Sequence, residues 1–403
     1  MEAGRLIAGL ARLTGDLGLA EELAQDALVA ALEHWPATGV PPNPGGWLMT
    51  TAKRRAIDLH RHRDMSERKL HLLADDRQPP SPADLAAASA DDHVGDDLLR
   101  LIFTACHPAL STESRVALVL KCLAGLSTAE IARAFLVSEP TIAQRIVRAK
   151  KTLSARQIAF EMPRAGDIAA RRGSVLEVVY LIFNEGYAAT AGEDWMRPEL
   201  CAEATRLGRV LVALMPADAE VGGLLALMEL QASRLPARTD AEGNPVLLAE
   251  QDRRRWDRLL LRRGLAELDR VRALDAPAGP YVVQAEIAAC HARATSVGET
   301  RWDQIAAWYA ILGHLWPSPV VELNRAIAVG MADGPAAGLA LLDELTGSGR
   351  LAGYPQLRAA RAEMLTRLGR PADARTEYER AAALSKNDRE RQLFFSRALA
   401  VPD

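Results

Sequence analysis

The sequence predicts an all-α protein built from several helical domains. Apolar residues recur at spacings of three and four along most of the chain, and the helix formers Ala, Leu, Arg and Glu dominate it. No segment shows a convincing polar and apolar alternation of the kind that marks a strand. At 403 residues the chain exceeds the size at which one hydrophobic core usually stops growing, so we expect two or three domains.

Composition narrows the class of protein. Apolar residues make up 49% of the chain and charged residues 25%, which is ordinary for a folded globular protein. The formal net charge of -3 argues against coating nucleic acid through bulk charge, although local basic stripes can still bind DNA. No apolar run is long enough to cross a bilayer and the N-terminus lacks the order of a secretory signal, so we expect a cytoplasmic protein.

Residues that mark metal sites or catalysis are sparse. The four cysteines are far apart and include no CxxC pair, which predicts reduced structural thiols. Cys106 and His107 are adjacent but have no matching ligands nearby in the sequence. We find no phosphate-binding loop, no HExxH and no GxSxG motif. The sequence therefore predicts no metal site, no cofactor and no enzyme activity.

The first helical block covers residues 1–70 and contains a two-faced helix in "DLGLAEELAQDALVAALEHW". Its inward apolar stripe consists of Leu19, Leu23, Ala27, Ala30 and Ala31. Its outward stripe is acidic and consists of Glu22, Gln25, Asp26, Val29 and Glu33. Taken alone, such a stripe is more often only a solvated helix face.

The same block ends in a basic segment, "NPGGWLMTTAKRRAIDLHRHR". Seven basic residues stand against three acids between residues 53 and 69: Lys53, Arg54, Arg55, Arg61, Arg63, Arg68 and Lys69 against Asp58, Asp64 and Glu67. DNA is the natural partner of a helix with this local charge. A lone aromatic at a helix start, such as Trp47, often packs inward instead.

An acidic stretch separates this block from the next. From His71 to Asp97 the chain carries aspartates against the single Arg77, with Pro79, Pro80 and Pro82 close together. This composition predicts a partly flexible linker, which we assign to residues 71–95.

The second block, residues 96–158, contains the sharpest local signal, "GLSTAEIARAFLVSEPTIAQRIVRAKKTL". Ser127 and Glu130 have the spacing of a capping box, and Ser138 with Pro140 predicts the start of a second helix. This is helix-turn-helix spacing, in which Ile131, Ala132, Val137, Ile142 and Ile146 pack the helices together. An ordinary hairpin with a solvated basic face is the alternative interpretation.

The outward side of the second helix is polar and basic. The candidates for contact with DNA are Ser127, Thr128, Ser138, Glu139, Thr141, Gln144, Arg145, Arg148 and Lys151. Gln144 and Arg145 suit base edges, whereas Arg148, Lys150 and Lys151 are better placed for phosphates.

The third zone, residues 168–403, predicts stacked helical hairpins. Ala374, Tyr378 and Ala381 align with Gly338, Leu342 and Leu345, and then with Ile305, Tyr309, Leu312 and Pro317. A fainter copy is Ala204, Gly208, Leu211 and Pro216, and residues 236–244 predict a loop. The period resembles that of tetratricopeptide repeats. A generic helical bundle is the alternative, and Glu185 in "YLIFNEGY" is either a helix-end group or part of a ligand pocket.

In their order and spacing these blocks resemble RNA polymerase sigma-70 factors of the extracytoplasmic-function (ECF) group, with region 2 before the linker, region 4 after it and a tetratricopeptide-like tail. Relatives generally carry more sequence before "RLIAGLARL", which leaves the position of the natural start open. The resemblance implies a factor that binds core RNA polymerase and directs promoter-specific initiation. Stacked helical repeats create a concave surface that commonly binds peptides or partner domains, so we expect the tail to bind a protein or peptide partner and to regulate the factor to which it is joined.

The resemblance also implies roles for particular residues. The polymerase-binding residues would be Glu22, Gln25, Asp26 and Val29. Those facing the promoter −10 element would be Asn43, Trp47, Lys53, Arg54, Asp58, Arg61 and Arg63. The helix-turn-helix residues named above would face the −35 element.

Two other classes of function stay open at this level. A one-component regulator would bind DNA through residues 127–146 and sense a ligand with its repeats, but it would not need an acidic stripe followed by a basic helix. An enzyme that uses the tail would need a catalytic constellation, and none is recognisable in the sequence.

Overall fold

The computed structural model describes residues 2–68, 94–135, 137–164, 167–189 and 194–401. These residues form helices and connecting turns, with a single isolated bridge between Thr239 and Pro245 in place of any strand. The predicted all-α fold is thus confirmed. The chain divides into two compact units, Met1–Val178 and Val179–Asp403, each of which is described by itself.

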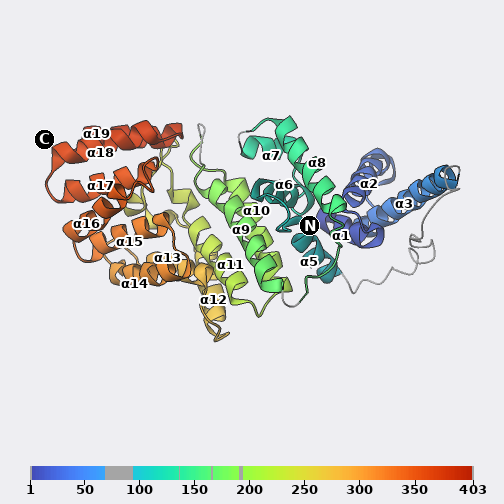
Figure 1. The fold of residues 1–403 in the computed structure, drawn as a ribbon, viewed down its shortest axis with the longest axis horizontal. Coiled ribbons are helices and arrows are strands. Elements are labelled where there is room, and N and C mark those ends of the chain that lie inside the picture. Colours follow the sequence, from blue (N-terminus) through green and yellow to red (C-terminus); the bar gives the residue numbers. More distant parts are fainter. Residues whose placement is uncertain (1, 69–93, 136, 165–166, 190–193, 402–403) are drawn as a thin grey trace. The chain divides into compact units, whose positions relative to one another are not determined.

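The N-terminal unit holds eight labelled helices, the last of which continues into the next unit (Figure 1). They are α1 (Glu2–Thr14), α2 (Leu17–Thr38), α3 (Pro44–Arg68), α5 (Val94–Ala105), α6 (Thr112–Cys122), α7 (Thr128–Ala134), α8 (Glu139–Ala155) and α9 (Ile168–Tyr187). Leu10, Leu23, Leu101 and Leu118 are among the side chains that fill its core. Helices α1, α2 and α3 pack together, and α5 packs on α1.

Helix α5 begins just before the expected boundary. The linker was assigned to residues 71–95, but α5 already begins at Val94, and its Asp97 is only 4% exposed. Its carboxylate accepts a hydrogen bond from Arg12 of α1 at 2.8 Å and from Arg100 at 2.7 Å. Burial of a carboxylate is tolerated when such partners compensate for lost water. The other aspartates of the stretch up to residue 93 lie outside the described residues.

The C-terminal unit, called the extension below, is a succession of helices. They are α10 (Pro198–Leu214), α11 (Ala219–Ala232), α12 (Arg258–Arg272), α13 (Pro280–Arg293), α14 (Trp302–Leu315), α15 (Pro319–Ala332), α16 (Pro335–Gly347), α17 (Pro355–Arg367), α18 (Pro371–Leu384) and α19 (Asp388–Ala400). Three 3₁₀ turns, Leu235–Ala237, Leu248–Glu250 and Arg253–Arg255, lie in the predicted loop region or just after it. From α13 to α19 each helix packs against the next (Figure 1).

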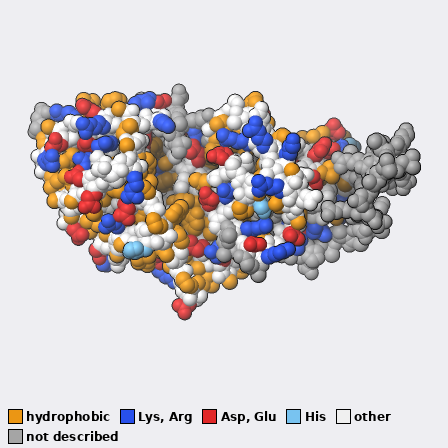
Figure 2. Space-filling view, viewed as in Figure 1, with side chains coloured by type: hydrophobic (Ala, Val, Ile, Leu, Met, Phe, Trp, Pro, Cys, Tyr) orange, Lys and Arg blue, Asp and Glu red, His pale blue; other side chains and the backbone are white. Residues whose placement is uncertain are grey.

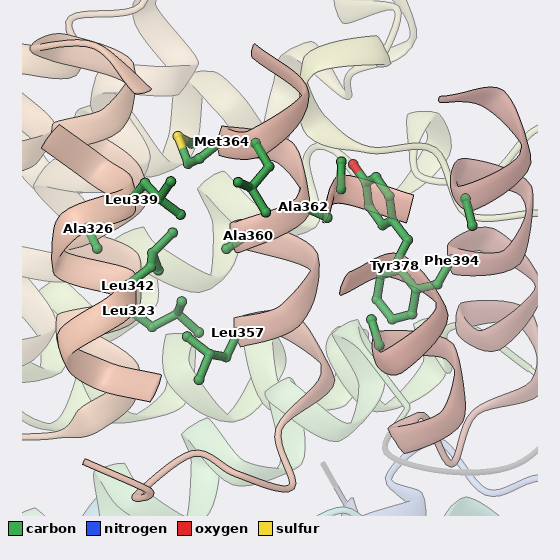
Figure 3. Close-up of a cluster of buried hydrophobic side chains, with 14 of the residues drawn as sticks. Leu323, Ala326, Leu339, Leu342, Leu357, Ala360, Ala362, Met364, Tyr378 and Phe394 are labelled. Carbon is green, nitrogen blue, oxygen red and sulfur yellow. The ribbon is translucent and has the colours of Figure 1, made fainter. Parts of the chain in front are cut away.

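The small residues of the predicted repeats allow this stacking. A Cβ atom on Gly338 of α16 would lie 2.6 Å from the Cα of Gly330 on α15, so the two backbones touch. Leu342 and Tyr378 are buried in the cluster that joins α15 to α19 (Figure 3). Of the aligned repeat positions, Leu342, Leu345, Ala374, Tyr378 and Ala381 are buried in this cluster, and the assignment to tetratricopeptide repeats stays a prediction.

The remaining sequence expectations concern thiols, metals and membranes. All four cysteines are free and buried, and burial raises the pKa of Cys106, Cys122 and Cys201 to about 12. Within the described ranges no cluster of His, Cys, Asp and Glu could hold a metal ion. Among the helices described there, none is both long and apolar enough to cross a bilayer.

Candidate functional site

Helix α2 presents the predicted acidic stripe. Its start is fixed by Asp16, whose carboxylate accepts hydrogen bonds from the backbone N–H groups of Gly18 at 2.6 Å and Leu19 at 3.0 Å. Glu22 and Gln25 are exposed, and Val29 is 50% exposed. Asp26 is half-buried and forms an ion pair with Arg55 of α3 at 3.0 Å. The stripe is available to a partner, and part of it is held by the basic helix beside it.

Two leucines that sequence reasoning left out extend this stripe. Leu28 is 38% exposed and Leu32 is 76% exposed, so with Val29 they form an aliphatic patch on a helix whose Leu17 and Leu23 are buried. Exposed aliphatic residues that gather on one face mark an interaction surface more often than isolated ones do. Their position outside the inward stripe was the available signal in the sequence.

The loop before α3 has a defined structure. Asn43 caps α3, since its side-chain oxygen accepts a hydrogen bond from the Gly46 N–H at 2.9 Å. Trp47 packs edge-on against Trp35, with ring centroids 5.5 Å apart, and remains half-buried. Trp47 therefore packs partly inward, as a lone aromatic at a helix start often does, and it also remains partly exposed.

The basic half of α3 is described only in part. Arg54 is exposed and Lys53 is half-buried. The helix continues to Arg68, but the side chains of Asp58, Arg61 and Arg63 lie outside the description that the structure gives.

The helix-turn-helix forms as the capping pattern predicts. The N–H of Ser127 donates to the Glu130 carboxylate at 2.7 Å, and the N–H of Glu130 donates to the Ser127 hydroxyl at 3.1 Å. Ser138 caps α8 through the N–H of Thr141 at 3.4 Å. Ile131 and Ile142 are buried between the helices.

The outward side of α8 carries most of the predicted DNA contacts. Glu139, Gln144, Arg148 and Lys151 are exposed, whereas Thr128, Thr141 and Arg145 are half-buried. Thr128 begins α7, and the other side chains named here lie on α8. Leu136, which the sequence places at the end of the first helix, lies outside the described residues.

Lys150 departs from the sequence expectation. Instead of joining the phosphate contacts, its ammonium group pairs with the Glu21 carboxylate of α2. Glu21 is 5% exposed, and Lys121 of α6 approaches the same carboxylate at 3.8 Å. Burial lowers the pKa of Lys150, while the nearby charge of Asp16 opposes that shift. Sequence reasoning missed Glu21 because its partners lie about a hundred residues or more away.

Family models match both parts of this unit. The model for sigma-70 region 2 matches residues 1–65, and the model for sigma-70 region 4 matches residues 100–153. A third model, described as a family of unknown function (DUF6596), matches residues 171–272 at the start of the extension.

A curated relative of the N-terminal part decides the family. The ECF RNA polymerase sigma factor SigL of Mycobacterium tuberculosis is 32% identical over 143 residues, which cover 35% of this chain and 76% of SigL. The chain belongs to the ECF sigma factors. This sigma factor is also 44% identical over 382 residues to the uncharacterized protein R00370 of Rhizobium meliloti, covering 94% of this chain and 89% of that protein. No solved structure matches the chain.

Family membership gives the function of the N-terminal unit. As a sigma factor, the protein is a non-enzymatic initiation factor that binds core RNA polymerase and promoter DNA and directs promoter-specific transcription. The relative that spans 94% of the chain shows that the extension is shared with at least one other protein.

The start of the extension is tied together by the "NEGY" segment. Glu185 forms an ion pair with Arg197, a buried residue at the start of α10. A Cβ atom on Gly186 would lie 2.7 Å from the backbone nitrogen of Cys201, so only glycine allows α10 to come this close. The helix-end alternative for Glu185 therefore fits the structure.

Proposed function

We propose that this sigma factor uses α2 to dock on core polymerase, α3 and its preceding loop to read the −10 element, and α8 to read the −35 element. We assign these roles to residues 1–70 and 96–158, joined by the linker 71–95, in a cytoplasmic protein. Residues 168–403 regulate the factor in cis and bind a protein or peptide partner. The residues that carry the three contacts are those inferred from the family resemblance.

The exposed aliphatic patch on α2 is the observation that carries the polymerase contact. Val29 and Leu32 are exposed on the same helix as Glu22 and Gln25, which are also exposed. The helix packs against the core through other apolar residues, so these two are not needed for that packing. Burial of such side chains at an interface would release apolar area from water, and the flanking acids would set orientation. A merely solvated helix face would have no need of Leu32 at 76% exposure.

The test is a binding measurement with core RNA polymerase. We expect Val29→Asp and Leu32→Asp each to weaken the complex about tenfold to a hundredfold, because central apolar contacts contribute about 1–3 kcal/mol to an interface. Competition with a labelled sigma factor gives the affinity, and run-off transcription on a cognate promoter gives the activity.

The matched control is Leu399→Asp, which places the same charge on an 85% exposed leucine of α19. It should leave polymerase affinity within about twofold. Equal affinity for wild type and both α2 variants would remove α2 from the interface.

A test of the proposed regulation needs a truncated chain that lacks the extension but keeps the packing of the N-terminal unit intact. The Ser174 hydroxyl of α9 donates to the Cys106 carbonyl at 2.7 Å, and Glu177 pairs with Arg115 at 3.2 Å, so the first turns of α9 pack within the N-terminal unit. A chain that ends at Val178 keeps these contacts. We expect its transcription output to differ from that of the full chain at equal polymerase occupancy; equal output would contradict regulation in cis.

A further inference from the structure

The extension contains two adjoining cavities that the sigma-factor role does not use. The larger has a volume of about 510 Å³ and mostly apolar walls that include Ile305, Met331 and Phe394, with three glutamates and three arginines also lining it. The smaller has a volume of about 440 Å³. Both are lined by His291 and Tyr309, so the two spaces share a wall. Each volume lies within the range of about 300–1,000 Å³ that small-molecule sites occupy.

The smaller cavity has an unusual charge balance. Among its described lining residues there is no Asp or Glu, and its one permanent charge is the guanidinium of Arg234. The other polar groups around it are neutral amides and hydroxyls, including Asn184, Gln284 and Asn324. By contrast, Figure 2 shows basic and acidic side chains interspersed over the visible face of the extension. A cavity with one sign of charge favours a ligand of the opposite sign.

Arg234 is poorly compensated within the protein. It is half-buried, and its side chain makes no hydrogen bond or ion pair with any described residue. Its Nε is shielded from solvent without an acceptor, and its guanidinium lies 5.7 Å from the ring centroid of Tyr187. A cation that is shielded from water and lacks an anionic partner destabilises the folded state, and a bound anion would offset that desolvation penalty through charge-assisted hydrogen bonds.

Two further arginines reinforce the positive potential. Arg253, beside the larger cavity, donates to the carbonyl oxygens of His291 at 2.7 Å and Ala294 at 2.6 Å, and these acceptors carry no charge. Arg238 is buried and stacks on Tyr187 at 3.7 Å instead of meeting a carboxylate. Burial, with the charge of Arg234, lowers the pKa of both guanidiniums.

The effect of this potential is visible at the shared wall. Burial lowers the pKa of His291 to about 3, and the charges of Arg234 and Arg253 add to that shift. The imidazole is therefore neutral near pH 7 and offers a hydrogen bond without a charge. The carboxylate of Glu299 acts on Arg253 from a distance, and its Oε2 accepts hydrogen bonds from both the N–H and the hydroxyl of Thr295.

We propose that the paired cavities bind a small organic anion with an apolar body, with its carboxylate or phosphate group at Arg234 and its body in the larger cavity. Guanidinium groups pair with both kinds of anion through charge-assisted hydrogen bonds. The apolar walls beyond His291 supply burial for the remainder of the ligand. The proposal concerns ligand binding and holds whether or not the extension regulates transcription.

Two dyes of nearly the same shape test the charge requirement on the full-length protein. Anilinonaphthalene sulfonate carries an anionic group, and phenylnaphthylamine has the same rings without it. We expect the protein to bind the sulfonate at least about tenfold more tightly, and Arg234→Gln to abolish that preference while phenylnaphthylamine affinity stays within about twofold. Fluorescence titration measures both affinities.

Two further variants separate binding from folding. Arg262→Gln removes an exposed arginine of α12 whose side chain, among the described residues, donates to the Arg258 carbonyl at 3.3 Å, and it should bind both dyes like wild type. Arg234→Lys keeps the charge and should retain part of the preference for the sulfonate. Thermal denaturation checks that each variant is folded. A sulfonate affinity unchanged by Arg234→Gln, or equal wild-type affinity for the two dyes, would overturn the proposal.

Competition identifies the kind of anion. Octanoate and octyl phosphate should displace the sulfonate dye from the wild-type protein, and the stronger competitor assigns the head group as carboxylate or phosphate. Octanol, with the same chain and no charge, should compete at least about tenfold more weakly. Displacement by an acidic peptide but by neither small anion would assign the space to a peptide and refute this proposal.

Discussion

The N-terminal unit and the extension place their binding chemistry in opposite locations. In the N-terminal unit the candidate contacts stand on the surface, as with Leu32 of α2 and Lys151 of α8, while a carboxylate such as Glu21 is buried among cations. In the extension Arg234 and Arg253 line cavities, and neither forms an ion pair with a carboxylate among the described residues. Large flat partners such as polymerase and DNA need exposed faces, whereas small ligands need enclosed ones.

This difference follows from how each unit packs. In the N-terminal unit, the predicted contact residues of α2 and α8 lie on the outer sides of helices that pack against their neighbours. The extension stacks helices in sequence, and such an arrangement leaves a concave side where side chains from distant helices converge. Arg234 and Asn324 line the same cavity although 90 positions separate them in the sequence.

The largest expected effect breaks the stacking and leaves the N-terminal unit alone. Gly338→Ala would place a Cβ 2.6 Å from the Gly330 Cα and 2.9 Å from the Ala326 carbonyl oxygen, both backbone atoms that cannot yield cheaply. We expect the free energy of unfolding of the extension to fall by about 3 kcal/mol. Urea unfolding followed by tryptophan fluorescence reports it, because five of the seven tryptophans lie at or beyond Trp195.

Gly347→Ala is the control on the same helix. A Cβ there meets no atom within 4 Å, so the substitution should be neutral or stabilise by up to about 1 kcal/mol. Polymerase binding should survive Gly338→Ala. If both glycine variants unfolded alike, close helix approach would not be what Gly338 provides.

How far the sequence predicted each unit depends on the range of the interactions. The capping box of Ser127 and Glu130 spans three residues, so it was readable before the structure and is confirmed. The pairing of Glu21 with Lys150 spans 129 positions, and no local pattern announces it. Small residues such as Gly338 announced close packing, but not which backbone they would meet.

The cavities were beyond sequence reasoning for the same reason. Arg234 lies next to the predicted loop, where an arginine is ordinarily a solvated charge. Its lack of a partner is a property of the whole extension, since only the fold excludes acids from the space around it. The apolar patch of Val29 and Leu32 is intermediate, because the sequence shows the residues and the structure shows that nothing in the described chain covers them.

The next largest expected effect is a dependence of the extension's stability on pH, which arises from His291 in the wall shared by the two cavities. His291 has a folded-state pKa of about 3, below its unfolded value of about 6.5. Between these two pH values, His291 is protonated in the unfolded chain but neutral in the folded chain. The stability that depends on neutral His291 is complete above about pH 6.5 and is lost as pH falls below it. We expect about 1–2 kcal/mol of loss between about pH 7 and about pH 5.

The comparison of wild type with His291→Gln isolates this contribution. Burial raises the pKa of Glu390, which works in the opposite direction at acid pH but is common to both proteins. Urea unfolding at each pH should show that the stability advantage of wild type over the variant shrinks as pH falls. The exposed His314 supplies the control as His314→Gln. A constant difference across this range would mean that His291 is not held neutral by its surroundings.

The smallest effect tests the surface side with two neighbouring lysines of α8. Lys151 is exposed, whereas Lys150 is paired with Glu21, so the two differ in access to phosphates and not in sequence context. Each phosphate contact contributes a slope of about −0.9 to the dependence of log affinity on log salt concentration. Lys151→Ala should therefore reduce the salt slope of DNA binding by about 1, and Lys150→Ala should leave it unchanged.

Because Lys150→Ala also removes a cationic partner from the buried Glu21, it should lower the stability of the N-terminal unit, whereas Lys151→Ala should not. The opposite pattern, with Lys150 setting the salt slope, would mean that α8 gives up its pairing with α2 when DNA binds, and the division between an exposed binding face and an internal ion pair would fail in this unit.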